Sequence, residues 1–254
     1  MGNAIFVGNS CWRDFCSNNF TKMNRAKKVI RGKIISPIKI LKNEVFYVTI
    51  EAAKHQEEMM GKVYVLIGKS ATGKDTVFSR LRESRELGLK TVVGYTTRPI
   101  RKGEEDGREY FFVSVEKWKE LCAAGKVVET RTYHTVKGDW HYFTADDGQI
   151  RPDGEDCLFI STLEGFEGLR RFYGEDMVVP VYVEVEDGLR LTRALAREKL
   201  QKQPNYEELC RRFLADQKDF SEENIKRAGI TKRYRNIVLD DCVEEIRNDI
   251  LGNH

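Results

Sequence analysis

The chain has 254 residues, of which 41% are hydrophobic and 33% are charged, a composition typical of a globular protein rather than a disordered or collagen-like one. Its net charge of +3 is too small to indicate nucleic-acid binding, and its apolar runs are too short to cross a membrane. We therefore expect neither a nucleic-acid partner nor a membrane partner. The six cysteines show no CxxC pair and no zinc-ligand spacing, so we expect reduced thiols and a cytoplasmic protein.

Residues 1–59 are predicted to be an N-terminal extension outside the main domain. The first 60 residues contain ten Lys or Arg against five Asp or Glu and show no sustained hydrophobic period. At most a short strand or two is expected, in residues 30–54. We expect Met59 or Met60 to be the natural start, which places residues 1–59 upstream of it and residues 60–254 in the domain.

From residue 61 onward, predicted strands alternate with predicted helices. The apolar run KVYVLI at 62–67 indicates a buried strand, and it leads through a glycine-rich turn into the amphipathic stretch KDTVFSRLRESRELG. Further strands are expected at 91–97, 155–162, 177–185 and 236–240, and helices around 115–124, 164–172, 187–200, 205–227 and 241–251. This alternation predicts an α/β fold, with a parallel sheet covered by helices on both faces.

The turn between the first strand and the first helix, GKSATGKD at 68–75, has the composition of a phosphate-binding loop. Its glycines allow backbone N–H groups to surround a phosphate, the helix N-terminus adds positive potential, and Lys74 supplies a charge. The candidate nucleotide-binding residues are Gly68, Lys69, Ser70, Ala71, Thr72, Gly73, Lys74, Asp75 and Thr76.

Asp75 departs from the usual form of such a loop, in which a Ser or Thr follows the lysine and its hydroxyl binds Mg²⁺. One interpretation is that the Asp75 carboxylate takes over the metal. The other is that Asp75 is only an acidic residue at a helix N-terminus, and that Thr76 alone serves the nucleotide. Both interpretations remain open, so Asp75 and Thr76 are the candidate metal ligands.

The stretch YTTRPIRKGEEDGREYFF, residues 95–112, resembles the acceptor-binding segment of the guanylate kinase family. The family pattern T-T-R-x-x-R-x-G-E-x-D-G-x-x-Y-x-F is matched at every fixed position from Thr96 to Phe112. Taken alone, the segment is a charged loop. At this distance after a phosphate loop, it indicates a site for a second phosphate-bearing molecule.

The resemblance covers residues 61 to about 251 and implies a P-loop NTPase-type sheet. It adds a small GMP-binding part at about 94–145 and a helical lid at about 187–215. It implies ATP as phosphoryl donor, Mg²⁺, and phosphorylation of GMP to GDP. By resemblance, Arg98, Arg101, Tyr110 and Tyr142 hold the GMP phosphate, while Glu129 reads the guanine base and Thr144 follows the phosphate-binding tyrosine.

The lid segment contributes arginines for the transferring phosphoryl group. Arg193 and Arg197 are four residues apart and so share a helix face, and Arg212 matches an arginine of the family's next helix. Phosphoryl transfer depends on positioning and charge neutralisation, which arginines supply. The candidate catalytic residues are therefore Lys74, Arg98, Arg193, Arg197 and Arg212.

Several positions depart from the family pattern and leave alternatives open. Ile160 and Thr162 stand where the family has acidic residues, and Gly94 stands where it often has a serine. The lid carries KLQKQPNYEE in place of a Gly-Arg-Gly-Thr run. The alternatives to a GMP kinase are a related P-loop kinase acting on ribose 1,5-bisphosphate, and a non-catalytic guanylate-kinase-like binding module.

Overall fold

The computed structural model describes residues 40–41, 44–45, 61–135, 138–151 and 154–252. The chain divides into two units, residues 1–56 and 57–254. In the first unit, strand β1 (Ile40–Leu41) pairs antiparallel with β2 (Glu44–Val45). The expectation that Met59 or Met60 is the natural start concerns residues outside the described part.

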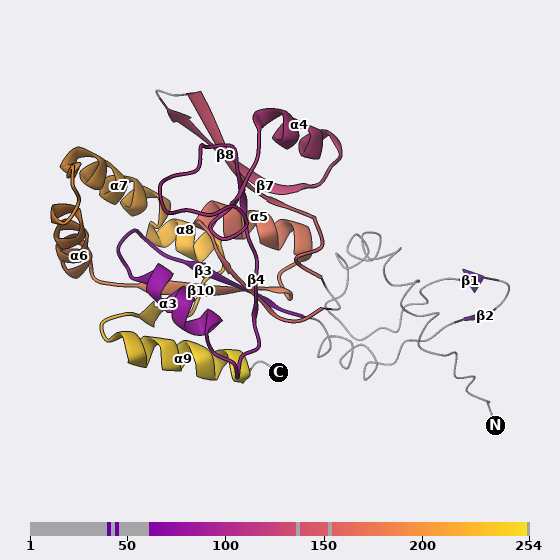
Figure 1. Ribbon diagram of the computed structural model, residues 1–254. Helices are drawn as coiled ribbons and strands as arrows, with labels where there is room; N and C mark the ends of the chain where they lie inside the picture. The colour runs from indigo at the N-terminus through magenta and orange to yellow at the C-terminus, as the bar shows by residue number, and fades with distance from the viewer. Residues whose placement is uncertain (1–39, 42–43, 46–60, 136–137, 152–153, 253–254) are drawn as a thin grey trace. The chain divides into compact units, whose positions relative to one another are not determined.

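A five-stranded parallel sheet forms the centre of the second unit, and Figure 1 shows helices on both of its faces. Its strand order is β11 (Tyr234–Arg235), β10 (Val178–Glu184), β3 (Val63–Ile67), β9 (Cys157–Ile160) and β4 (Lys90–Thr91). All five residues of β3 are buried, as an apolar run in the middle of a parallel sheet requires. The predicted α/β fold with helices on both faces is confirmed.

Alternate residues of β3 pack into two separate hydrophobic cores. Val63, Val65 and Ile67 face α5 (Leu163–Tyr173) and α8 (Glu222–Arg227). Tyr64 and Leu66 face α3 (Lys74–Arg82) and α9 (Leu239–Leu251). Because side chains alternate along a strand, the one central strand holds both helix layers in place.

A second sheet of four strands stands beside the first and carries α4 (Val115–Ala123). Its order is β6 (Phe111–Phe112), β5 (Tyr95–Thr96), β8 (Gly138–Ala145) and β7 (Val127–Thr135). The β7–β8 hairpin is antiparallel, and its register places Glu129 opposite Thr144 and Arg131 opposite Tyr142. This hairpin lies in the segment predicted to bind the acceptor.

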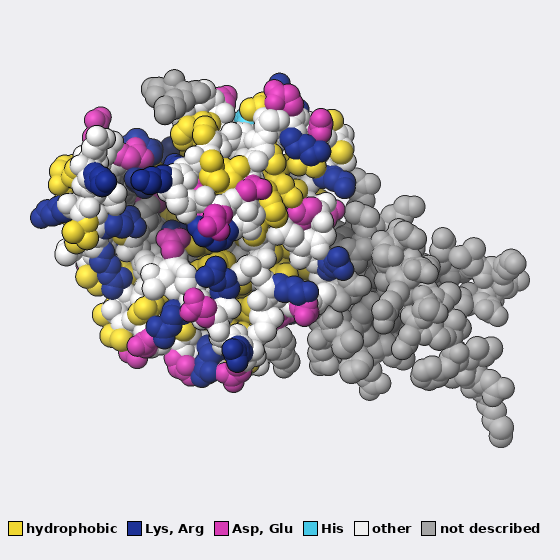
Figure 2. All heavy atoms as spheres, in the orientation of Figure 1, with side chains coloured by type: hydrophobic (Ala, Val, Ile, Leu, Met, Phe, Trp, Pro, Cys, Tyr) yellow, Lys and Arg dark blue, Asp and Glu magenta, His cyan; other side chains and the backbone are white. Residues whose placement is uncertain are grey.

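Helices α6 (Asp187–Lys199) and α7 (Tyr206–Asp219) pack against each other and occupy the segment predicted to be the lid. On the face shown in Figure 2, Lys and Arg side chains gather over this helix pair. Among the residues that the structure describes, no helix is both long and apolar enough to span a membrane.

The single strand predicted at 91–97 is wrong, because the chain leaves one sheet and enters the other within it. Val92 still donates to the Leu158 carbonyl of β9 at 3.0 Å. The Val93 amide instead donates to the Gln149 side chain at 2.8 Å. After Gly94, the chain continues as β5 in the second sheet, so its two halves belong to different parts of the molecule.

Two other predicted elements have different bounds in the structure. The helix predicted over 205–227 is two helices, because Phe220 turns into the core and Ser221 caps α8 by accepting from the Asn224 amide at 3.3 Å. The strand predicted at 236–240 is wrong. Its apolar residues Ile237 and Val238 are 66% and 53% exposed.

Candidate active site

The loop that joins β3 to α3 is held in shape by close contacts with the backbone and with Asn236. A Cβ at Gly68 would lie 2.4 Å from the Val183 carbonyl oxygen of β10, so only glycine fits there. At Gly73, where α3 begins, φ is 84° and a Cβ would lie 2.4 Å from Asn236 Nδ2. Asn236 also donates to the Thr72 carbonyl at 2.8 Å. Both glycines of the predicted phosphate loop are therefore required by the fold.

The first turn of α3 presents the charged and hydroxyl groups of the loop. The Lys74 side chain is 20% exposed, and its Nζ lies 3.9 Å from the Asp75 carboxylate, whose side chain is 76% exposed. Amides in the first turn of a helix have no helical partner, and the helix dipole adds positive potential. These amides and Lys74 form a site suited to phosphate oxygens.

Asp75 and Thr76 are both exposed on this turn, so their oxygens are free to reach a metal ion. Mg²⁺ bound to nucleotide phosphates takes only one or two oxygens from the protein and keeps several waters. Within the described residues, no group of three or more His, Cys, Asp or Glu side chains could hold a metal. The residues present therefore fit a Mg²⁺ ion coordinated mainly by the nucleotide phosphates and water, and not one coordinated by protein side chains alone.

Arg98 lies at the centre of a buried cluster in the second sheet. Its side chain is 3% exposed and forms a bidentate pair with the Glu104 carboxylate, with both distances at 2.7 Å. Its Nε donates to the Tyr142 hydroxyl at 3.0 Å, and its guanidinium lies 5.4 Å from the Tyr110 ring centre. The hydrogen bonds from Arg98 lower the pKa of Glu104 to about 2.

The structure brings together three of the four residues predicted to hold the acceptor phosphate: Arg98, Tyr110 and Tyr142. The Tyr110 and Tyr142 rings meet edge to face with centres 5.5 Å apart. Burial raises the pKa of the Tyr110 hydroxyl, which therefore stays protonated and able to donate to an anion. Arg101 differs from the other three, since it is exposed and only its amide joins the cluster, donating to Glu104 at 2.8 Å.

Glu129 and Thr144, predicted to lie at the base-reading end, are in direct contact. The Thr144 hydroxyl donates to Glu129 Oε1 at 2.7 Å, and both residues are buried. Gly168 of α5 makes room for this pair, because a Cβ at that position would lie 2.5 Å from Glu129 Cβ. A buried carboxylate is thus held beside α5 by the Thr144 hydroxyl.

Arg131 also contacts Glu129, a contact that the sequence analysis did not predict although the spacing of the two residues indicates it. Its Nε donates to Glu129 Oε2 at 3.1 Å, and one of its two terminal nitrogens donates to the Thr162 hydroxyl at 2.8 Å. Residues two apart on a strand point to the same face. Arg131 follows Glu129 by two positions, so a strand assigned to 127–135 would have placed the two side chains together.

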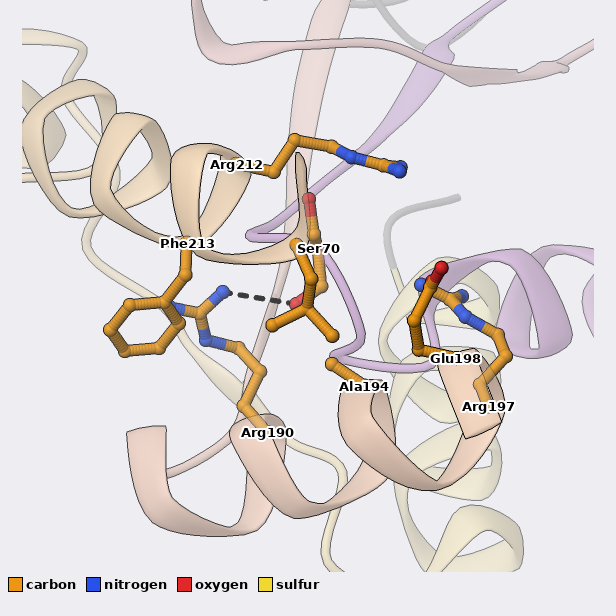
Figure 3. Close-up of a pocket in the computed structure, with 8 residues that line it drawn as sticks. Ser70, Arg190, Ala194, Arg197, Glu198, Arg212 and Phe213 are labelled. Carbon is orange, nitrogen blue, oxygen red and sulfur yellow. Dashed lines mark hydrogen bonds between the residues drawn. The ribbon is translucent and has the colours of Figure 1, made fainter. Parts of the chain in front are cut away.

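Of the three predicted lid arginines, two meet at one pocket. Arg197 of α6 and Arg212 of α7 line this pocket together with Ser70 of the phosphate loop. Figure 3 shows both guanidinium groups extending to the side of the pocket on which Glu198 lies. Arg193 does not line it, and its guanidinium instead donates to the Ile237 carbonyl at 3.4 Å.

A further arginine, Arg190, connects α6 and α7 to the loop. It is 1% exposed, and one terminal nitrogen donates to the Ser70 carbonyl at 3.1 Å (Figure 3). The same nitrogen donates to the Asp216 carboxylate at 2.9 Å. Its guanidinium also lies 4.3 Å from the ring centre of Phe213. In the sequence, Arg190 is three residues from both Asp187 and Arg193. Nothing in that spacing distinguishes a buried arginine from a solvated one.

Comparisons with known proteins relate this chain to one family of enzymes. A family model described as guanylate kinase matches residues 49–163. A guanylate kinase from Porphyromonas gingivalis is 30% identical over 199 residues, which are 75% of this chain and 97% of that protein. A guanylate kinase from Rhodopseudomonas palustris is 37% identical over 123 residues, which are 48% of this chain and 54% of that protein.

Among solved structures, a guanylate kinase from Anaplasma phagocytophilum superposes with a TM-score of 0.51. The match covers 76% of this chain and 86% of the other, at 22% identity. At that identity the likeness supports the fold, whereas the assignment to a family depends on the sequence comparisons.

Proposed function

Because the chain belongs to the guanylate kinase family, we propose that it transfers the γ-phosphoryl group of ATP to the phosphate of GMP, releasing ADP and GDP. This activity belongs to purine nucleotide metabolism, and we expect it in the cytoplasm. The substrates are small nucleotides, and neither nucleic acid nor a membrane is required.

The observation that carries the proposal is the placement of Tyr142 and Thr144 on one face of β8. Tyr142 belongs to the phosphate-binding cluster, because its hydroxyl accepts from Arg98 at 3.0 Å. Thr144 belongs to the base-reading pair, because it donates to Glu129 at 2.7 Å. Residues two apart on a strand are separated by roughly 7 Å. An anion site and a buried carboxylate at this spacing suit the two ends of a nucleoside monophosphate.

At the base end, a buried carboxylate is suited to guanine. Guanine presents an N1–H donor that a carboxylate can accept, whereas N1 of adenine carries no hydrogen and is itself an acceptor. We assign base reading to Glu129, with Thr144 fixing the orientation of its carboxylate. Tyr110, Tyr142 and Arg98 are assigned to the acceptor phosphate, and Arg101, whose side chain is exposed, is assigned there as well.

At the donor end, residues 68–76 are assigned to the ATP phosphates. The reaction requires two negatively charged groups to be held together, and its main demand is positive charge around the transferring group. We assign that charge to Lys74, Arg98, Arg193, Arg197 and Arg212. Bound Mg²⁺ would neutralise phosphate charge, and we assign Asp75 and Thr76 to that ion or its waters.

Two other functions are less well supported by the site. A kinase for ribose 1,5-bisphosphate would need the phosphate cluster but would have no use for a buried carboxylate such as Glu129. A non-catalytic binding module would not need the phosphate loop, whose glycines and Lys74 are all present.

An assay of ADP formation with a panel of acceptors tests the proposal. The panel contains GMP, dGMP, AMP, UMP and ribose 1,5-bisphosphate, each with ATP and Mg²⁺. We expect the highest kcat/KM with GMP. A higher kcat/KM with the sugar bisphosphate would establish the first alternative, and binding of GMP without ADP formation would establish the second.

A further inference from the structure

At the proposed base-reading site, the guanidinium of Arg131 already pairs with the Glu129 carboxylate. Arg131 donates to Glu129 through two nitrogens, Nε to Oε2 at 3.1 Å and a terminal nitrogen to Oε1 at 3.4 Å. The exposed fractions of the two side chains are 13% and 5%. The pair is therefore enclosed and makes its contacts away from bulk water.

The hydrogen-bonding capacity of Glu129 is nearly used up by its protein partners. A carboxylate has about four lone-pair sites, two on each oxygen. Oε1 accepts from Thr144 and from Arg131, while Oε2 accepts from Arg131. One site on Oε2 remains, so Glu129 cannot also accept two parallel donors from a bound base.

Arg131 is held in place from its other side as well. Its second terminal nitrogen donates to the Thr162 hydroxyl at 2.8 Å, and Thr162 caps α5 by accepting from the Gly165 amide at 3.2 Å. A Cβ at Gly165 would lie 3.4 Å from Arg131 Cζ, an ordinary van der Waals contact, so the guanidinium packs directly against the first turn of α5. Of the five N–H groups of an arginine, three are engaged here and one remains on each terminal nitrogen.

We propose that Arg131 determines base specificity, because it makes the pocket read a 6-oxopurine through one donor and one acceptor. One of the two remaining Arg131 N–H groups would donate to the purine O6, and the remaining Glu129 site would accept from N1–H. The purine 2-amino group is then left unread. The proposal rests on the proposed function, and it predicts that inosine 5′-monophosphate, which lacks the 2-amino group, is accepted nearly as well as GMP.

The alternative within the same pocket is that Arg131 swings away and guanine binds both oxygens of Glu129. That arrangement would strongly reject a purine without the 2-amino group, because a buried carboxylate oxygen would be left unpaired. The relative use of GMP and inosine 5′-monophosphate therefore separates the two arrangements.

The test measures kcat/KM for GMP and for inosine 5′-monophosphate in the full chain and in Arg131→Met, which keeps the aliphatic stem. We expect the full chain to favour GMP by less than about tenfold. We expect Arg131→Met to raise this preference by at least about tenfold, because it frees both oxygens for guanine. As a matched control, Arg227→Met removes an exposed arginine that contacts Glu167 of α5 and should leave the ratio unchanged.

Two results would overturn the inference: a preference above about 100-fold in the full chain, or an unchanged ratio in Arg131→Met. If the methionine variant does not fold, Arg131→Ala gives the same comparison, since alanine also removes every side-chain donor to Glu129. Absence of GMP phosphorylation in the full chain would instead contradict the proposed function, so the two failures are distinguishable.

Discussion

The Asp216 carboxylate of α7 accepts a hydrogen bond from the Ser70 amide of the phosphate loop at 2.8 Å. The same oxygen accepts from the buried Arg190 at 2.9 Å, and Arg190 donates to the Ser70 carbonyl at 3.1 Å. Both the amide and the carbonyl of Ser70 are therefore hydrogen-bonded to residues of α6 and α7. The Lys69 ammonium adds a hydrogen bond to Gln217 and an ion pair with Asp187. The loop and the lid helices form one hydrogen-bonded network.

Asp216→Ala is expected to lower the free energy of unfolding by about 3 kcal/mol, because it leaves Arg190 buried with fewer partners. It should also raise the KM for ATP more than the KM for GMP, because the network fixes Ser70 of the phosphate loop, which is assigned to ATP. Urea unfolding and steady-state kinetics measure the two effects. Asp219→Ala, which removes an exposed carboxylate from the same helix, should change stability by less than about 0.5 kcal/mol. Equal effects of the two substitutions would contradict the network.

Glu129→Gln is expected to weaken the binding of GMP by roughly 1.5 to 3 kcal/mol, because the base and Arg131 both lose a charged acceptor. The binding of ATP should change far less. Measurement of KM for each nucleotide tests this. Glu83→Gln, at an exposed position after α3, is the matched control and should change neither KM. Equal losses for ATP and GMP would count against a base-reading role for Glu129.

The pair of Arg98 with Glu104 predicts a pH dependence of stability. The pKa of Glu104 is lowered from 4.5 to about 2, so its contribution is fully present above about pH 4.5 and is lost as the pH falls towards 2. Glu104→Gln should therefore destabilise the protein at pH 7 by about 1 kcal/mol, allowing for solvent screening, and by progressively less below pH 4.5. Urea unfolding across this range measures the difference. Glu105→Gln, at the exposed position next to Glu104, should show no pH-dependent difference in stability from the unsubstituted chain.

Asp75→Ala is expected to lower the rate and to raise the Mg²⁺ concentration for half-maximal rate by about tenfold, if the carboxylate positions the metal. Asp75→Ser should recover much of both by restoring the usual hydroxyl. Asp241→Ala, at the matching first turn of α9, should leave the Mg²⁺ dependence unaltered. An unchanged Mg²⁺ dependence in Asp75→Ala would show that Asp75 does not position the metal, which would then be bound by Thr76, water and the nucleotide.

A chain that begins at Met60 is expected to fold and to keep full activity. Among the residues that the structure describes in the second unit, Gly61 is the first, and a Cβ there would lie 2.4 Å from the Gly154 carbonyl. The amide of Lys62 donates to Asp156 at 2.7 Å. We expect the melting temperature to stay within about 4 °C of that of the full chain, as measured by calorimetry. A fall of many degrees would show that residues 1–59 stabilise the domain.

The parts of the site that could be predicted from the sequence are those set by local geometry. The glycines of the phosphate loop and the motif from Thr96 to Phe112 occupy fixed spacings, and the structure places them as a loop before α3 and as the Arg98 cluster. Strand β3 and its alternating faces likewise follow from a short apolar run.

The parts that could not be predicted depend on contacts between distant segments. Arg190 and Asp216 are 26 residues apart and meet Ser70, which is 120 residues from Arg190. Neither spacing nor composition marks such a contact. The break at Gly94 has the same origin, because Gln149 takes the amide that a longer strand would have used. Arg131 differs from these, since its alternation with Glu129 on β7 was visible in the sequence.

The shared face of Tyr142 and Thr144 also limits how the acceptor site can change. Their separation is fixed by the covalent backbone of β8 and not by any one side chain, so point substitutions can alter affinity at either end without altering the distance between the ends. Selection for acceptors of a different length would require an insertion or a bulge in β8. A one-residue insertion that shifts the register would turn every later side chain of the strand to the opposite face, whereas a bulge would bend β8 and disrupt its local pairing. Acceptor length should therefore be far harder to redesign in this protein than the identity of the base.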